Sequence, residues 1–254
     1  PQFVKAAMVS RAIVNHNKDG GRPQITEEII HTGQHYNPEM SDIFFEQMGI
    51  PEPAVNLEVG SGSHGAMTAK MLEGIEKELI ARKPDWLLVY GDTNSTLAGA
   101  LAASKLHVPV AHVEAGLRSF NKKMPEEINR ILTDHVSKLL LCPTESAVEN
   151  LHNEGLTGGV IHMGDVMYDA AKVFAEIAED RSTILAELEL SEGNYYLVTV
   201  HRAENTDFKE RLTAIFEGLA EVAKDAPVVY PVHPRTKKYI AKYGLEETCS
   251  ALKM

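Results

Sequence analysis

The feature that most constrains the fold is a series of short apolar runs, rich in Val, Leu and Ile, that alternate with helical stretches. Strands that are apolar along their whole length are buried on both faces, as in parallel sheets covered by helices. The sequence therefore predicts an α/β chain with doubly wound sheets. The runs lie within residues 25–35, 85–94, 108–118, 138–146, 159–167, 195–205 and 227–236.

The runs fall into two series, which predict two Rossmann-like domains. We expect an N-terminal domain over residues 1–166 and a C-terminal domain, incomplete here, over residues 167–254. The chain opens with a helix that no strand precedes and stops without a terminating element, so we expect it to be truncated at both ends.

Apolar residues at helical spacing predict helices between the strands, including residues 39–50, 65–83 and 211–225. The clearest stripe lies in residues 65–83, and we expect it to belong to the core. Its members are Met67, Met71, Leu72, Ile75 and Leu79.

The composition excludes several classes of function. The 25 basic and 36 acidic residues give a formal net charge of −11, which disfavours binding to nucleic acid or to an anionic membrane. No apolar run approaches the roughly 20 residues that a membrane-spanning helix needs. Two cysteines are too few for a disulfide scaffold, so a reducing, cytoplasmic setting fits best.

Polar and ionisable side chains collect where the predicted strands end. In an open parallel sheet, ligands bind beyond the carboxyl ends of the strands, where loops meet helix N-termini. Charges that only solvate a surface have no reason to gather there, so we expect a ligand-binding cleft. These residues are Gln34, His35, Asp92, Glu114, Thr144, Glu145, Asp165, His201, Arg202, His233 and Arg235.

Two carboxylates at neighbouring strand ends indicate acid and base chemistry. Asp92 follows a buried strand and a glycine, whereas residues 93–95 are typical helix caps. Glu114 leaves the next strand and can point into the same cleft. Repulsion and desolvation would raise the pKa of both carboxyls, which suits acid and base roles near neutral pH. The alternative is a Glu114–Arg118 ion pair that only holds the loop.

The segment "MPEEINRILTDH" predicts a helix with Pro125 in its first turn. Glu126 and Glu127 lie near the positive end of the helix dipole, which alone would account for one of them. Glu127 and Arg130 stand three residues apart and can pair, which leaves Glu126 for chemistry.

In the second series, "VTVHRAEN" places His201 and Arg202 at a strand end. A histidine there can transfer a proton or hydrogen-bond a ligand phosphate, and an arginine can hold a phosphate through two hydrogen bonds. A histidine satisfied only by backbone is the alternative.

Other motifs are weak, and we expect neither a metal nor a cofactor. "GSGSHG" matches a dinucleotide-binding loop, but two prolines precede it and no acid closes the next strand about 20 residues on. His112 and Glu114 share a strand face, yet the sequence has no H-E-x-x-H motif or cysteine pair. It also lacks a nucleophile elbow and a Walker loop.

Together these segments resemble the non-hydrolysing UDP-N-acetylglucosamine 2-epimerases. The likeness runs in family order over nearly all of the chain, and "HVEAGLR" combined with "PEE-x-NR" is highly specific. The stretches are "PQFVK", "GQHY", "PDWLLVYGDTNSTLAGALAA", "VPVAHVEAGLRSF", "MPEEINRILTDH", "PTESAVENL", "GDVMYDA", "VTVHRAEN" and "VHPRT".

The resemblance implies a two-domain fold of the glycosyltransferase-B type, a nucleotide sugar in the cleft, a homodimer and a place in cell-surface polysaccharide biosynthesis. The family's chemistry removes the C2 proton while UDP departs from C1, which leaves a 2-acetamidoglucal. UDP then re-adds and a proton reaches the opposite face of C2, so UDP-GlcNAc and UDP-ManNAc interconvert. By motif, the catalytic residues are Asp92, Glu114, Glu126 and His201. Substrate contacts are expected from Lys5, Gln34, His35, Arg118, Arg202 and His233.

Some features depart from the family pattern. The arginine before the opening proline and a later Ser-Gly-Gly…Glu segment that binds UDP are missing, so we expect the intact protein to be the enzyme and the 254-residue chain not to be. "HTGQHY" and "GSGSHGAMT" resemble archaeal members and the branch that acts on UDP-2,3-diacetamido-2,3-dideoxyglucuronate. Allosteric activation by substrate is therefore not expected.

Four alternatives stay open. An epimerase of that glucuronate would need a cation for the C6 carboxylate, such as Arg118, Lys122 or Lys123. A hydrolysing epimerase would release UDP and free N-acetylmannosamine, and a glycosyltransferase would transfer the sugar to an acceptor. A non-catalytic UDP-sugar-binding protein is disfavoured, because it would need a phosphate cradle but not the acids.

Overall fold

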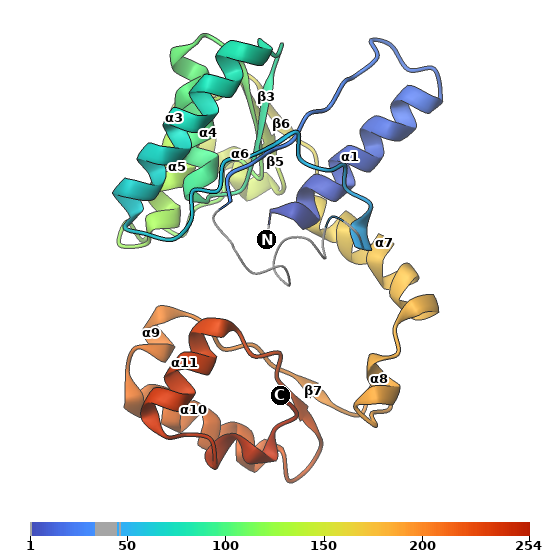
Figure 1. Ribbon diagram of the computed structural model, residues 1–254, viewed down its shortest axis with the longest axis vertical. Coiled ribbons are helices and arrows are strands. Elements are labelled where there is room, and N and C mark those ends of the chain that lie inside the picture. The colour runs from blue at the N-terminus through green and yellow to red at the C-terminus, as the bar shows by residue number, and fades with distance from the viewer. Residues whose placement is uncertain (1, 34–44, 46) are drawn as a thin grey trace. The chain divides into compact units, whose positions relative to one another are not determined.

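The structure, a computed structural model, describes residues 2–33, 45 and 47–254 (Figure 1). The chain divides into two compact units, Pro1–Ala175 and Glu176–Met254. Gln34, His35 and most of the helix predicted over residues 39–50 lie outside the described residues. The division of roles between residues 1–166 and 167–254 stays a prediction.

The first unit contains a four-stranded parallel sheet in the order β3-β4-β5-β6. A separate parallel pair, β1 with β2, lies earlier in the chain. Helices and strands alternate, as the apolar runs predict. The elements are α1 (Phe3–Lys18), β1 (Ile30–His31), β2 (Val55–Asn56), α3 (His64–Arg82), β3 (Leu87–Tyr90), α4 (Asn94–Lys105), β4 (Val110–Val113), α5 (Pro125–Val136), β5 (Leu139–Cys142), α6 (Glu145–Asn153), β6 (Val160–His162) and α7 (Val166–Arg181), which continues into the second unit.

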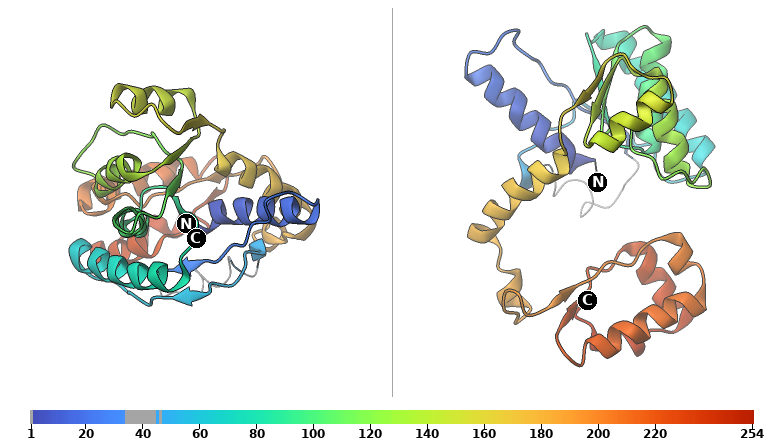
Figure 2. Two further views of the ribbon diagram at one scale, coloured as in Figure 1. Left: turned by 90° about the horizontal axis from the view of Figure 1, so that it is seen from above. Right: turned by 180° about the vertical axis from the view of Figure 1, so that it is seen from behind.

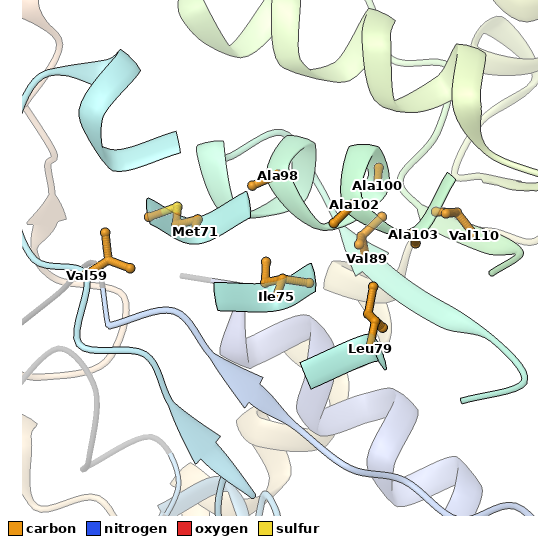
Figure 3. Packing of buried hydrophobic residues seen from close by; sticks show 10 residues of the cluster. All are labelled: Val59, Met71, Ile75, Leu79, Val89, Ala98, Ala100, Ala102, Ala103 and Val110. Carbon is orange, nitrogen blue, oxygen red and sulfur yellow. The ribbon is translucent and has the colours of Figure 1, made fainter. Parts of the chain in front are cut away.

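The main core of this unit forms where α3 packs on α4 and β3. Helices α3, α4 and α5 lie side by side along the sheet (Figures 1 and 2). From α3, the side chains of Met71, Ile75 and Leu79 meet a row of alanines on α4, whose small size lets the helices approach closely (Figure 3). The predicted apolar stripe is thus confirmed as core, with Met67 and Leu72 packed at its margin.

The second unit is built on a parallel pair of strands, β7 and β8. Its core packs Leu212 and Phe216 of α10 against Val228 and Tyr230. Both strands are shorter than the apolar runs that predict them. The elements are α8 (Ile184–Glu187), β7 (Tyr196–Leu197), α9 (Ala203–Thr206), α10 (Lys209–Val222), β8 (Val228–Val229), α11 (Pro234–Tyr243) and the 3₁₀ helix η2 (Thr248–Ala251).

Side-chain caps begin several helices directly after the strands. Thr93 caps α4 through a capping box with Thr96, so the predicted capping is confirmed for this residue. Thr144 caps α6 by accepting from the Ala147 N–H at 3.1 Å. Pro125 occupies the first turn of α5, as predicted. The short turns before α4 and α6 hold these two loops at one edge of the sheet, whereas a longer loop joins β4 to α5.

Gly116 offers a test of how closely one of these loops packs on α6. Its φ is +78°, and a Cβ there would lie 2.3 Å from the Ala147 carbonyl oxygen. Gly155 is the matched control, because its φ is +83° but a Cβ would meet nothing within 4 Å. We expect Gly155→Ala to lower the free energy of unfolding by ~1–2 kcal/mol through backbone strain. Gly116→Ala should lower it by at least ~1–3 kcal/mol more, because the backbone must also shift.

Urea unfolding followed by circular dichroism would measure both free energies. Equal losses in the two variants would contradict the close approach of the loop to α6.

Candidate active site

The carboxyl ends of β3 and β4 bring Asp92 and Glu114 to the same edge of the sheet. The strands are parallel and in register, with Tyr90 beside Val113. The N–H of Gly91, the residue before Asp92, donates to the carbonyl oxygen of Val113, the residue before Glu114, at 3.0 Å. The sequence-based expectation that these loops meet at one edge therefore matches the geometry.

Helix α5 holds Asp92 at two points. The Asp92 carboxylate forms a close ion pair with Arg130, and its backbone carbonyl accepts from the Asn129 amide at 2.9 Å. Arg130 also lies 3.3 Å from Glu127, so the predicted Glu127–Arg130 pair is confirmed. The Asp92 side chain is 30% exposed, which leaves it accessible despite these contacts.

Glu114 sits in a strained backbone conformation and contacts a lysine from α1. Its φ is +69°, a region that usually costs a residue with a side chain ~1–3 kcal/mol and that clusters at functional sites. Its carboxylate meets Lys5 in a close ion pair, and both side chains are largely buried. The Lys5 side chain packs against Gly91, because a Cβ added to Gly91 would lie 2.9 Å from Nζ of Lys5. The alternative in which Glu114 pairs with Arg118 is thus wrong, because Lys5 is its partner.

The two glutamates of α5 have different surroundings. Glu127 is buried and accepts hydrogen bonds from the Ser119 N–H and hydroxyl, both at 2.9 Å, and from the Phe120 N–H at 2.8 Å. Burial alone would raise the pKa of Glu127, but these hydrogen bonds and the nearby Arg130 outweigh it and lower the pKa. Glu126 is exposed, and its carboxylate has no hydrogen-bond or ion-pair partner among the residues that the structure describes. It is therefore open to a ligand.

Arg118 is held inside the first unit. Its guanidinium is 1% exposed and donates to Asp134 and to Glu154, with each distance 2.7 Å. A substrate contact by Arg118, or its use for a C6 carboxylate, would require these ion pairs to open.

In the second unit, the structure brings together the two histidines predicted at strand ends. The rings of His201 and His233 stack with centroids 5.4 Å apart. Nδ1 of His201 lies 3.0 Å from the Thr199 hydroxyl, and Nδ1 of His233 accepts from the Arg235 N–H at 3.1 Å. Arg202, which follows His201 in the sequence, is exposed and lies 3.8 Å from Glu204. Such a set of exposed donors suits an anionic ligand.

Two groups of residues escape sequence-based reasoning. The Asn129 amide, which holds Asp92, also donates to Asn94 at 3.2 Å, and Asn94 lies 3.2 Å from Nδ1 of His64. His112 is buried within the sheet beside Asp134. For Asn129, the motif "PEE-x-NR" contains a signal, since the residue stands next to Arg130. For the others, the partners are too far apart in sequence to be recognised.

Comparison with known proteins identifies the chain. A family model described as UDP-N-acetylglucosamine 2-epimerase matches residues 19–253. The chain belongs to this family. The α/β fold class with Rossmann-like units of the glycosyltransferase-B type is confirmed with it. Among the described residues, no helix is long and apolar enough to cross a bilayer.

Three relatives show how close the epimerase likeness is. A UDP-N-acetylglucosamine 2-epimerase homolog of Methanococcus maripaludis is 54% identical over 97% of this chain and 67% of its own. The UDP-2,3-diacetamido-2,3-dideoxy-D-glucuronate 2-epimerase of Pseudomonas aeruginosa is also 54% identical, over 97% of this chain and 68% of its own. The crystal structure of Methanocaldococcus jannaschii UDP-GlcNAc 2-epimerase, in complex with UDP-GlcNAc and UDP, superposes with a TM-score of 0.88 at 45% identity, covering 99% of this chain and 69% of that one. The chain thus spans about two thirds of the length of these relatives.

The adjacent glutamates of α5 allow a matched test of stability. We expect Glu127→Gln to lower the free energy of unfolding at neutral pH by ~2–3 kcal/mol, because hydrogen bonds to a buried charge are lost. Glu126→Gln, on the exposed side chain, should change it by less than ~0.5 kcal/mol.

The difference should depend on pH with a defined sign. Since folding lowers the pKa of Glu127 below its ordinary value of 4.5, the ionised carboxylate stabilises the fold fully above that pH. This contribution is lost as the pH falls through the folded-state pKa. Urea unfolding of both variants across this range would check it, and a Glu127→Gln effect that grows toward low pH would contradict it.

Proposed function

We propose that the protein is a non-hydrolysing UDP-N-acetylglucosamine 2-epimerase that interconverts UDP-GlcNAc and UDP-ManNAc by anti elimination and re-addition of UDP. The observation that carries the proposal is the placement of Asp92 and Glu114 at adjoining strand ends in a chain of this family. Epimerisation at C2 requires removal of a proton from one face of the sugar and delivery to the other. Two carboxylates at adjoining strand ends, each paired with a cationic side chain, suit this task.

The proposed roles follow from the acidic side chains at the ends of β3 and β4 and at the start of α5. Proton transfer at C2 is assigned to the set Asp92, Glu114 and Glu126. Lys5 pairs with Glu114, which supports the proposal that it contacts the substrate beside that acid. Retention of the acids favours an enzyme over a silent binding protein, since a binder would not need them.

The leaving UDP needs a cradle for its diphosphate. His201, Arg202 and His233 supply imidazole and guanidinium donors at the strand ends of the second unit. His201 is also the proposed fourth catalytic group. Gln34 and His35 keep their proposed substrate contacts. A homodimer and a cytoplasmic setting stay predictions of the resemblance.

The second candidate substrate is UDP-2,3-diacetamido-2,3-dideoxyglucuronate, because the Pseudomonas aeruginosa relative is as similar as the Methanococcus one. Its C6 carboxylate would need a cation. Arg118 is engaged by two carboxylates, whereas Lys122 and Lys123 are exposed on the loop that Glu127 anchors. These lysines are the better candidates.

Turnover in D₂O tests the proposed function. Proton NMR of the full-length protein with UDP-GlcNAc should show loss of the C2 proton signal and appearance of a deuterated manno product, because the proton is exchanged with solvent. Product without deuterium at C2 would exclude proton abstraction there. No product from UDP-GlcNAc, but product from the diacetamidoglucuronate, would move the assignment to the second candidate. UDP that accumulates in step with turnover would indicate a hydrolysing enzyme.

Asp92→Asn tests the role of one acid. We expect kcat to fall at least ~10²-fold, because the amide cannot transfer the proton. The free energy of unfolding should fall by no more than ~1 kcal/mol, because the ion pair with Arg130 is partly exposed. Asp85→Asn is the matched control, since Asp85 is exposed near the opposite end of the same strand. Near-normal turnover in Asp92→Asn would reduce Asp92 to a structural residue.

A further inference from the structure

His112 lies in β4 with no exposed surface, and both nitrogens of its ring have partners. Nδ1 is 2.7 Å from Oδ1 of Asp134, whose side chain is also fully buried. Nε2 is 2.7 Å from the carbonyl oxygen of Gly91. Neither His112 nor Asp134 transfers a proton in the proposed reaction.

The partners determine where the hydrogens of the ring lie. A backbone carbonyl only accepts, so Nε2 of His112 must carry a hydrogen. Nδ1 faces a carboxylate, which also accepts when it is ionised. With Asp134 ionised, both ring nitrogens therefore donate, and the ring is an imidazolium.

The surrounding charges balance such a cation. Asp134 also accepts from Arg118, and Arg118 in turn pairs with Glu154, so two cations and two carboxylates form one chain of contacts. Cys142 packs nearby on β5, and burial raises the pKa of its thiol to about 11, so it adds no charge.

This pair holds both loops that carry the proposed acids. Through Nε2, the ring fixes the carbonyl of Gly91, the residue before Asp92. Through its second oxygen, Asp134 accepts from the N–H of Gly116 at 3.1 Å, two residues after Glu114. The buried His112–Asp134 pair therefore links the backbone at the end of β3 to the backbone at the end of β4.

We propose that His112, doubly protonated and paired with Asp134, is a positioning residue that holds Asp92 and Glu114 in place for proton transfer. The inference rests on the proposed epimerase function. The geometry that underlies it is independent of that function, so the two can fail separately.

The protonation of the ring is tested on the full-length protein labelled with ¹⁵N-histidine, near pH ~8, where an unperturbed histidine with a pKa of ~6.5 is mostly neutral. We expect one ring to show two N–H protons that exchange slowly with solvent. Loss of these signals in His112→Gln or His112→Asn assigns them. A neutral His112 ring at this pH would overturn the proposal, whatever the activity of the protein.

Two substitutions separate the two hydrogen bonds of the ring. The amide of His112→Gln reaches the position of Nε2 and can donate to Gly91, whereas that of His112→Asn reaches the position of Nδ1 and can donate only to Asp134. We expect kcat to fall at least ~10-fold further in His112→Asn than in His112→Gln, with KM within ~3-fold in both. The free energies of unfolding should fall by similar amounts.

Each kinetic outcome has a distinct meaning. If the unaltered protein epimerises neither candidate sugar, the proposed function fails, and the NMR result still decides the state of the ring. If the unaltered protein is active and both variants keep normal kcat, His112 does not position the acids. Losses of kcat that are equal in the two variants and track their stability would show a purely structural residue and overturn the proposal.

Discussion

The contact of α5 with the carboxyl ends of β3 and β4 is the interaction on which the candidate site depends. This helix is amphipathic in the reverse of the usual sense, because its buried residues are Glu127, Asn129, Thr133 and Asp134, all of them polar. Meanwhile Ile128 and Leu132 are 45% and 44% exposed. Burying a polar helix face costs free energy unless its groups find partners. Glu127, Asn129 and Asp134 find theirs at the ends of β3 and β4 and in the loop that follows β4, whereas the Thr133 hydroxyl has no partner among the described residues. These contacts join α5 to the loops that carry Asp92 and Glu114.

Much of the fold could be predicted from the sequence, because the signals are local. Apolar runs without alternation indicated buried parallel strands, and Met71, Ile75 and Leu79 marked the face of α3 that packs on α4. The meeting of Asp92 and Glu114 at one edge followed from a general rule of parallel sheets rather than from their own neighbours. The pairing of Glu127 with Arg130 followed from helical spacing alone.

The contacts that escaped prediction join residues far apart in the chain. Lys5 and Glu114 are 109 positions apart, and nothing near either residue signals the other. The resemblance predicts a substrate contact for Arg118, which stays a prediction, but nothing in the sequence signals that its guanidinium pairs with Asp134 and Glu154. A search for apolar stripes on α5 would likewise fail, since it would place Ile128 and Leu132 inside, although both are exposed.

The reversed face of α5 also bears on how this protein can be altered. Schemes that stabilise proteins commonly make buried positions more apolar and exposed positions more polar. On α5 only the change at exposed positions applies, so Ile128 and Leu132 can be replaced by polar residues. An apolar side chain at Glu127 or Asp134 would leave several buried hydrogen-bond donors without an acceptor. Substitutions on this helix should therefore be tolerated at its exposed apolar positions and should destabilise the protein at its buried polar positions.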